Sequence, residues 1–173
     1  MKLTIEQLKQ MGVRADRAVR FVEAINDTLR RYDIDTALRV QHWLAQVLHE
    51  SGRLFYVEEI ASGAAYEGRR DLGNTQPGDG ARYHGRGYIQ LTGRANYRSY
   101  GDRLGVALER RPGLALRPAV GARVLARYFK ERGIDDHARR GQWRDVRLEV
   151  NGGLNGWTTY ERTVSSLLRA SQG

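Results

Sequence analysis

Apolar residues recur at helical spacing along much of this chain, which predicts a mainly α-helical protein. Between residues 16 and 32, Val19, Val22, Ile25 and Leu29 follow one another at intervals of three and four, as on one face of a helix. The Thr4-to-Gln7 spacing is a capping box and predicts a short helix that ends near residue 11. Further helices are predicted at 94–104, 118–132, 135–140, 142–150 and 158–170.

Residues 36–50 are predicted to form the central buried helix. Apolar side chains, among them Leu38, Trp43 and Leu48, lie around most of its circumference, and Asp35 is expected to cap its start. Gly52 is a natural stop signal two residues after Glu50. Burial favours the protonated form of a carboxylic acid, so an acidic side chain at the end of such a helix suits general acid catalysis.

The segment 62–83 has the composition of an ordered loop, since it combines five glycines with embedded tyrosine and leucine side chains. Residues 83–93 alternate weakly and predict a short strand or β-hairpin. We therefore expect one domain over residues 1–173, with a helical lobe and a small loop-and-hairpin lobe inserted at about 53–93.

Two glutamates on either side of the predicted helix stop are candidates for chemistry. On an uninterrupted helix the nine steps from Glu50 to Glu59 turn through about 900°, so their side chains would face opposite ways. The break at Gly52 lets the chain fold back and bring them together. One protonated and one ionised carboxyl across a cleft are what hydrolysis of a glycosidic bond requires. The plainer alternative is two solvated side chains.

The composition favours an anionic binding partner and argues against disulfide and metal sites. A net charge of +9 favours an anionic partner, and no basic run with interleaved aromatics indicates nucleic acid. The chain has no cysteine and its four histidines lack metal-ligand spacing, so we expect no disulfide, metal or cofactor. His49-Glu50 is not a zinc-protease motif, because Arg53 stands where the second histidine is needed. We see no signal peptide and no apolar run of transmembrane length, and expect synthesis in the cytoplasm.

Several blocks together resemble glycoside hydrolase family 19, both its chitinases and, more closely, its phage and prophage endolysins. They are His49-Glu50-Ser51-Gly52, Tyr56-Val57-Glu58-Glu59, the long block from Tyr83-His84-Gly85-Arg86-Gly87 through Gln90-Leu91-Thr92-Gly93 to Asn96-Tyr97, and Asn151-Gly152-Gly153. The resemblance implies a lysozyme-like, two-lobed helical fold. Arg53 departs from the family pattern, which has a second glycine there, and Asn155 replaces a carboxylate of the plant enzymes.

The resemblance implies an inverting mechanism in which Glu50 is the general acid and Glu59 the general base. That mechanism needs carboxyl groups roughly 6.5–9.5 Å apart. Glu58, next to Glu59, is an alternative base. Glu67 is a second alternative, although we expect it to pair with an arginine such as Arg69, Arg70 or Arg86.

Further site residues are also implied by the resemblance. Thr92 would hold the catalytic water, or alternatively make only a local hydrogen bond. Arg162 would lie near the carboxylates, or alternatively be one more exposed arginine. Tyr83 and Tyr97 would offer rings and hydroxyls to sugars, unless they belong to the core. The amides implied to bind sugar are Gln90, Asn96 and Asn151.

Chitin and peptidoglycan share β-1,4-linked N-acetylated sugars, so the catalytic residues do not separate them. The short, cationic chain without a chitin-binding or separate wall-binding domain favours peptidoglycan and the anionic bacterial envelope. We therefore expect a monomeric endolysin-like muramidase for Gram-negative cells, which reaches the wall after another protein has permeabilised the membrane. The alternatives are a chitinase acting on chitin oligomers and a non-catalytic cationic wall-binding module.

Overall fold

The computed structural model describes residues 2–170, apart from the side chains of Ala37, Asn151 and residues 166–170. In the described part the α-helices are α1 (Ile5–Gln10), α2 (Ala15–Arg31), α3 (Ala37–Glu50), α4 (Asp79–Arg82), α5 (Arg94–Leu104), α6 (Pro118–Glu131), α7 (Ile134–Arg139), α8 (Trp143–Asn151) and α9 (Trp157–Ala170). Short 3-10 helices occupy Ala64–Tyr66, Arg70–Leu72 and Pro112–Leu116. The mainly helical prediction is confirmed, as is the Thr4 capping box.

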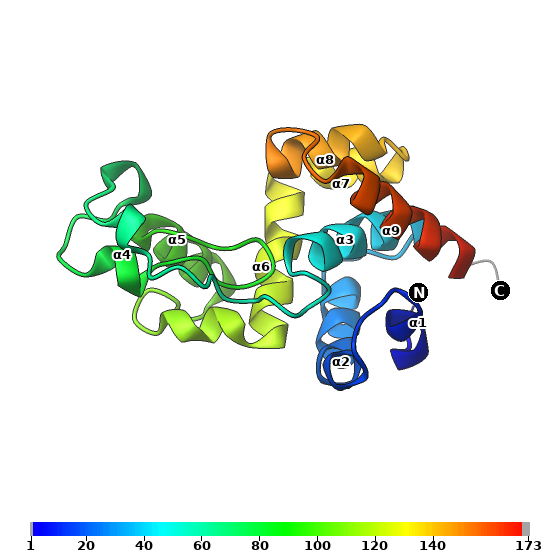
Figure 1. Ribbon diagram of the computed structural model, residues 1–173, viewed down its shortest axis with the longest axis horizontal. Coiled ribbons are helices and arrows are strands. Elements are labelled where there is room, and N and C mark those ends of the chain that lie inside the picture. Colours follow the sequence, from blue (N-terminus) through cyan, green and yellow to red (C-terminus); the bar gives the residue numbers. More distant parts are fainter. Residues whose placement is uncertain (1, 171–173) are drawn as a thin grey trace.

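Helix α6 stands between two parts of the molecule (Figure 1). On one side α1, α2, α3, α7, α8 and α9 enclose the larger apolar core, while α4, α5 and the long connecting segments lie on the other side around a second core. The second core includes Tyr83, Leu91, Tyr97, Leu108 and Val124, and so extends beyond the predicted lobe boundary at residue 93. Among the described helices, none has the length and apolar character needed to cross a membrane.

Helix α3 is the buried centre of the larger core, as predicted. Every residue from Val40 to Leu48 is buried, including the fully enclosed Trp43. The predicted cap was wrong by one residue, because Thr36 accepts the hydrogen bond from the Arg39 amide. Asp35 instead forms an ion pair with the Arg39 guanidinium at 3.0 Å.

Helix α2 departs from its predicted face at one position. Val22, Ile25 and Leu29 are buried, but Val19 is 61% exposed. The buried stripe begins at Ala18 and continues through Phe21. One residue turns a helix by about 100°, which carries Val19 beyond the edge of that stripe.

The predicted β-hairpin at residues 83–93 is absent from the described structure. The segment makes isolated bridges, with Arg86 opposite both Glu58 and Leu91. Gly87 and Gln90 both have positive φ, so the chain reverses within the turn between them. Because the chain reverses directly after Arg86, Arg86 and Leu91 are the last residues that can pair before the turn, and no hairpin ladder of several residue pairs forms there.

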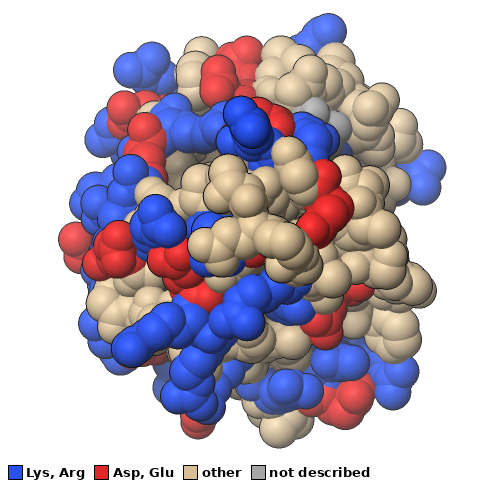
Figure 2. Space-filling view, turned by 90° about the vertical axis from the view of Figure 1, so that its left-hand side faces the viewer, with Lys and Arg blue, Asp and Glu red and all other residues tan. Residues whose placement is uncertain are grey.

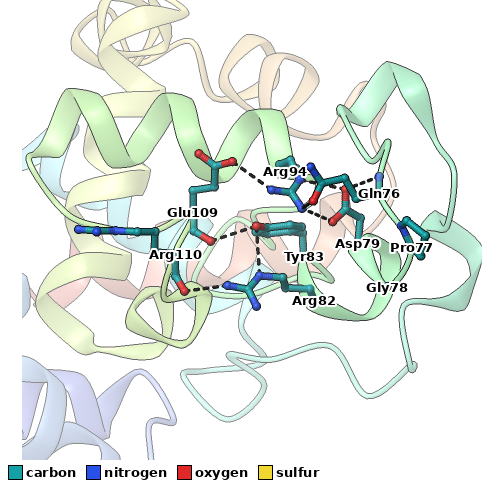
Figure 3. Close-up of a pocket in the computed structure, with 9 residues that line it drawn as sticks. All are labelled: Gln76, Pro77, Gly78, Asp79, Arg82, Tyr83, Arg94, Glu109 and Arg110. Carbon is teal, nitrogen blue, oxygen red and sulfur yellow. Dashed lines mark hydrogen bonds and ion pairs between the residues drawn. The ribbon is translucent and has the colours of Figure 1, made fainter.

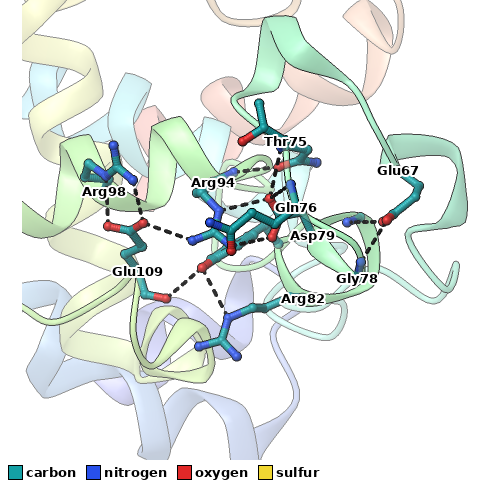
Figure 4. A network of polar contacts seen from close by, with 12 residues as sticks. Glu67, Thr75, Gln76, Gly78, Asp79, Arg82, Arg94, Arg98 and Glu109 are labelled. Carbon is teal, nitrogen blue, oxygen red and sulfur yellow. Dashed lines mark hydrogen bonds and ion pairs between the residues drawn. The ribbon is translucent and has the colours of Figure 1, made fainter.

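The loop-rich part is held by a network of ion pairs around Asp79 (Figure 4). Arg94 donates to Asp79 and to Glu109, and Arg98 donates to Glu109. The Arg94 hydrogen bonds lower the pKa of Asp79, and Arg98, followed by Arg94, lowers the pKa of Glu109 to about 2. The ionised forms of both acids therefore stabilise the fold, and this contribution is lost as pH falls towards their lowered pKa values.

Asp79→Asn should destabilise the protein by roughly 3 kcal/mol, because its side chain is almost fully buried and the substitution breaks its pairing with Arg94. Urea unfolding at pH 7 measures this loss. Asp102→Asn, on the exposed surface of α5, is the matched control and should change stability by less than about 0.5 kcal/mol. Equal stability of the Asp79 variant and the control would show that the network does not hold the lobe.

Candidate active site

The end of helix α3 turns sharply at the predicted stop. Ser51 is the C-cap of the helix, and its amide donates a hydrogen bond to the Val47 carbonyl. Its hydroxyl oxygen accepts a hydrogen bond of 2.8 Å from the Leu54 amide. Gly52, Arg53 and Leu54 all have left-handed backbones, with φ of 53°, 58° and 67°. This turn redirects the chain after Glu50 and begins the segment that leads to Glu59.

Glu50 is held by a buried arginine from helix α8. Its Oε1 accepts a hydrogen bond of 2.6 Å from Arg147, whose side chain is 2% exposed. The same guanidinium donates to Gln46 Oε1 at 3.1 Å and to the Asn155 carbonyl at 2.6 Å. Because its partners come from α3 and from the segment after α8, Arg147 fixes the Glu50 side chain between these elements.

His49 completes this cluster as a neutral acceptor. Its Nε2 lies 2.9 Å from Arg147, and burial followed by the Arg147 charge lowers its pKa. Gly156 permits the close approach of the following segment, since a Cβ atom there would lie 2.4 Å from His49 Cε1. The cluster around Glu50 therefore depends on a glycine as well as on Arg147.

Glu59 is half-buried and receives a donor on each oxygen. Tyr66 donates its hydroxyl to Oε1 at 3.0 Å, and the Gly85 amide donates to Oε2 at 2.9 Å. The hydrogen bond to Glu59 is also the main reason that the pKa of Tyr66 is raised. A Cβ atom at Gly85 would lie 3.0 Å from Glu59 Oε2 and 2.8 Å from Gln90 Oε1. A glycine at 85 thus lets the backbone and Gln90 approach this carboxylate.

Glu58, the alternative base, has a different environment. It is exposed, and its Oε1 accepts from Arg86 Nε at 2.9 Å and lies 3.1 Å from His84 Nε2. Glu67 accepts hydrogen bonds from the Gly78 and Gly80 amides, in place of the arginine that we expected. The carboxylates of Glu58 and Glu67 thus each have hydrogen-bond partners of their own, and these differ from the partners of Glu59.

Three predicted site residues of the 90–96 segment donate to nearby backbone carbonyls. Thr92 donates its hydroxyl to the Gln90 carbonyl at 2.8 Å, Gln90 donates to the Gly87 carbonyl, and Asn96 donates to the Thr92 carbonyl. Thr92 thus makes the local hydrogen bond that was the alternative to its predicted role. Its hydroxyl oxygen still has lone pairs available to accept from a water.

The predicted sugar-binding rings of Tyr83 and Tyr97 lie in the core. Both are buried, with ring centroids 5.3 Å apart, and they donate their hydroxyls to the carbonyls of Glu109 and His84. Burial raises the pKa of Tyr97 to about 12. In this conformation neither ring face is available to a sugar, because each packs against the rest of the second core.

Two predicted residues remain. The side chain of Asn151 lies outside the described residues. Arg162 is exposed on α9 and lines a hollow with Arg53. The arginine that donates a hydrogen bond to Glu50 is Arg147. Arg147 had a signal in the sequence, since with Trp143, Val146 and Val150 it follows the three-and-four spacing of a buried face. A charged residue at a core position is a candidate for a buried ion pair.

Another hollow, of about 680 Å³, lies in the loop-rich part (Figure 3). Asp79, Arg94 and Glu109 line it, but they are bonded to one another. Arg82 also lines it and donates to the Tyr83 hydroxyl and the Arg110 carbonyl. Neither Glu50 nor Glu59 lines this hollow. The ion pairs among its charged residues stabilise the loop-rich part of the fold. The described residues contain no cluster of three metal-binding side chains.

Comparison with known proteins supports one family. No family model matches the chain. An endochitinase of Arabidopsis thaliana is 36% identical over 110 residues, covering 64% of this chain and 38% of the relative. A glycosyl hydrolase family 19 domain-containing protein of Haemophilus influenzae is 32% identical over 98 residues, covering 57% and 47%. A second Arabidopsis endochitinase is 32% identical over 145 residues, covering 79% and 53%. The chain thus spans about half or less of the length of these relatives.

Solved structures share the fold over almost the whole chain. Chitinase C from Streptomyces griseus superposes with a TM-score of 0.74 at 24% identity, over 98% of this chain and 75% of that protein. A bacterial family 19 chitinase superposes with a TM-score of 0.76 at 24% identity, over 95% and 94%. In its sequence this chain is similar to endochitinases and to a glycosyl hydrolase family 19 domain-containing protein, and its fold is that of bacterial chitinases, one of them of family 19.

Proposed function

We propose that this protein is an inverting glycoside hydrolase that cleaves β-1,4 bonds in the glycan strands of bacterial peptidoglycan. The observation that carries the catalytic part is a pair of carboxylates, one before and one after the turn that ends α3, each held by hydrogen bonds. Glu50 is fixed by Arg147, and Glu59 is fixed by Tyr66 and the Gly85 amide. Two positioned carboxylates that differ in their hydrogen-bond partners suit an acid and a base.

In this mechanism Glu50 protonates the departing glycosidic oxygen. Arg147 occupies its Oε1, so Oε2 is the oxygen that would take up a proton and deliver it to the glycosidic oxygen. Glu59 removes a proton from water on the opposite face of the sugar, and the two donors on its oxygens match a carboxylate in its ionised state. Thr92, through its remaining lone pairs, would accept a hydrogen bond from that water.

Peptidoglycan as the substrate is supported by charge. The net charge is +9, and basic side chains cover much of the face at the loop-rich end of the molecule, with acidic ones scattered among them (Figure 2). Such a surface attracts an anionic envelope. Chitin is the second candidate, because the Arabidopsis relatives and the bacterial structures are chitinases. As an endolysin-type enzyme, the protein would reach the wall once the membrane has been permeabilised.

Glu50→Gln and Glu59→Gln should each lower the rate of clearing of outer-membrane-permeabilised cells by about 10²–10⁴-fold, because each removes one proton-transfer group. Glu58→Gln should lose far less, since its carboxylate pairs with Arg86 and His84. Glu23→Gln, exposed on α2, is a matched control that should retain full activity. Equal clearing by wild type and Glu50→Gln would point to a non-catalytic wall-binding module.

The products should identify both the linkage and the stereochemistry. Muramidase cleavage leaves N-acetylmuramic acid at the new reducing end, and inversion of a β bond releases the α anomer first. Mass spectrometry of digested peptidoglycan and early-time NMR of the products measure these. Reducing-end N-acetylglucosamine would overturn the muramidase assignment, and an initial β anomer would overturn inversion. Turnover of chitin oligomers but not of peptidoglycan would favour the second candidate.

Added salt should slow the clearing of permeabilised cells if positive charge draws the protein to the envelope. Screening shortens the reach of charge from about 10 Å at 0.1 M to about 3 Å at 1 M salt. Initial clearing rates across this range measure the effect. Hydrolysis of a neutral chitin oligomer provides the control reaction. An unchanged clearing rate would argue against electrostatic capture of the envelope.

A further inference from the structure

The hydrogen bonds around Glu59 continue beyond its direct partners. Its Oε2 accepts from the Gly85 amide at 2.9 Å, and its own amide donates to the Gly85 carbonyl at 2.9 Å. On the neighbouring residue pair, Glu58 and Arg86 form a bridge between antiparallel segments. The backbone therefore holds residue 85 against residue 59, and the direction of the Gly85 N–H bond decides whether the carboxylate receives a donor.

The peptide group between His84 and Gly85 is also held on its other side. A trans peptide is planar and its C=O and N–H bonds point in opposite directions, so a partner on the carbonyl orients the amide as well. The Tyr97 hydroxyl donates to the His84 carbonyl at 2.9 Å. The N–H of the same peptide group points at Glu59 because its carbonyl is bound to a side chain of helix α5.

Arg86 fixes the direction in which the Tyr97 hydroxyl donates. Its Nη1 donates to the Tyr97 oxygen at 3.2 Å, which leaves the hydroxyl proton for the His84 carbonyl. The same nitrogen donates to the Arg82 carbonyl at 2.9 Å, and Nε donates to Glu58 Oε1 at 2.9 Å. The Arg86 side chain is 11% exposed, so these partners together hold the guanidinium in one position.

These bonds form one chain from a cation to a carboxylate. It runs from the Arg86 guanidinium through the Tyr97 hydroxyl and the peptide group before Gly85 to Glu59. Hydrogen bonds in such a chain polarise one another, so each strengthens the next. A fixed donor aimed at a carboxylate stabilises its ionised form and needs no rearrangement during the reaction. The hydroxyl stays protonated, because burial raises the pKa of Tyr97 to about 12.

Tyr83 makes an equivalent set of bonds that leads elsewhere. Its ring centroid lies 5.3 Å from that of Tyr97 in the same core. Its hydroxyl also accepts from an arginine, Arg82 at 3.1 Å, and also donates to a backbone carbonyl, that of Glu109 at 3.0 Å. The two buried tyrosines therefore differ in the peptide group that each one holds, and Tyr97 holds the peptide group that donates to the proposed base.

We propose that Arg86 and Tyr97 are positioning residues for the proposed base, which act by fixing the His84–Gly85 peptide group so that its amide donates to Glu59. This inference rests on the proposed function. It gives a buried tyrosine and an arginine a role in the reaction that requires no contact with the sugar.

Tyr97→Phe tests this role, because it removes the hydroxyl and keeps the ring in the core. On whichever polymer wild type cleaves, kcat should fall about tenfold with little change in KM, since a hydrogen bond to a charged group is weakened. The acidic limb of the pH–rate profile, on which the base must be ionised, should move to higher pH, and the basic limb should stay in place. Arg86→Lys should lie between wild type and Arg86→Gln, because an ammonium keeps the charge without the planar set of donors.

Tyr83→Phe is the matched control. It removes an equivalent buried hydrogen bond from the same core, so it should lower thermal stability about as much as Tyr97→Phe does. It should leave kcat and both limbs of the pH–rate profile as in wild type. A purely structural role would make the two variants alike, and a Tyr97→Phe rate that fell equally at all pH values would overturn the inference.

The amide proton of Gly85 provides a second readout that does not depend on catalysis. In wild type its NMR chemical shift should titrate with the ionisation of Glu59, and Glu59→Gln should abolish this titration. Tyr97→Phe should move the Gly85 proton upfield and reduce the amplitude of its titration, whereas Tyr83→Phe should leave both as in wild type. An unaltered Gly85 amide proton in Tyr97→Phe would overturn the positioning role.

Failure of this inference differs from failure of the proposed function. If hydrolysis and the Gly85 titration are the same in wild type and Tyr97→Phe, the positioning role is wrong and the hydrolase stands. If wild type cleaves chitin oligomers alone, only the substrate proposal is wrong, because the pH–rate profiles are then measured on chitin. If folded wild type cleaves neither polymer, the proposed function is wrong, and the role of Arg86 and Tyr97 in the reaction is wrong with it.

Discussion

The ion pair between the buried Arg147 guanidinium and the partly exposed Glu50 carboxylate is the constraint around which the candidate site is arranged. A guanidinium that is 2% exposed must have its charge and its donors matched, since an unpaired buried charge costs several kcal/mol. Gln46, His49 and the Asn155 carbonyl supply the remaining partners. The central helix, helix α8 and the segment before α9 are therefore tied together at the point where the proposed acid lies.

The turn after α3 connects this cluster with the second carboxylate. Its three left-handed residues end the helix at once, so the chain leaves the larger core towards the loop-rich part. There Gly85 lets the backbone approach Glu59, and Tyr66 donates its hydroxyl to Glu59. The Tyr66 carbonyl accepts from Asn74, whose side chain accepts in turn from the Arg94 amide. One carboxylate thus depends on the helical core and the other on the loop-rich part.

The sequence predicted the helices well because their signals are local. The boundaries of α5 and the start of α6 at Pro118 follow from residues within or beside each element. The errors came where longer-range packing decides. In place of the predicted hairpin at 83–93, the chain forms a turn with positive φ at Gly87 and Gln90. Val19 lies outside the buried stripe of α2, which includes Ala18 and Phe21. For Tyr83 and Tyr97 the sequence had left sugar binding and core burial open, and both rings pack in the second core.

The sequence by itself determined the helical class, the helix stop after Glu50, the positive charge and the resemblance to one glycoside hydrolase family. All of these depend on residue types and on spacing along the chain. Only the tertiary structure decided that Arg147 holds Glu50, that Tyr66 and Gly85 hold Glu59, and that Arg53 and Arg162 share a hollow. Arg147 lies 97 residues from Glu50 in the chain. A contact of that separation is fixed by how helices pack, which local patterns do not encode.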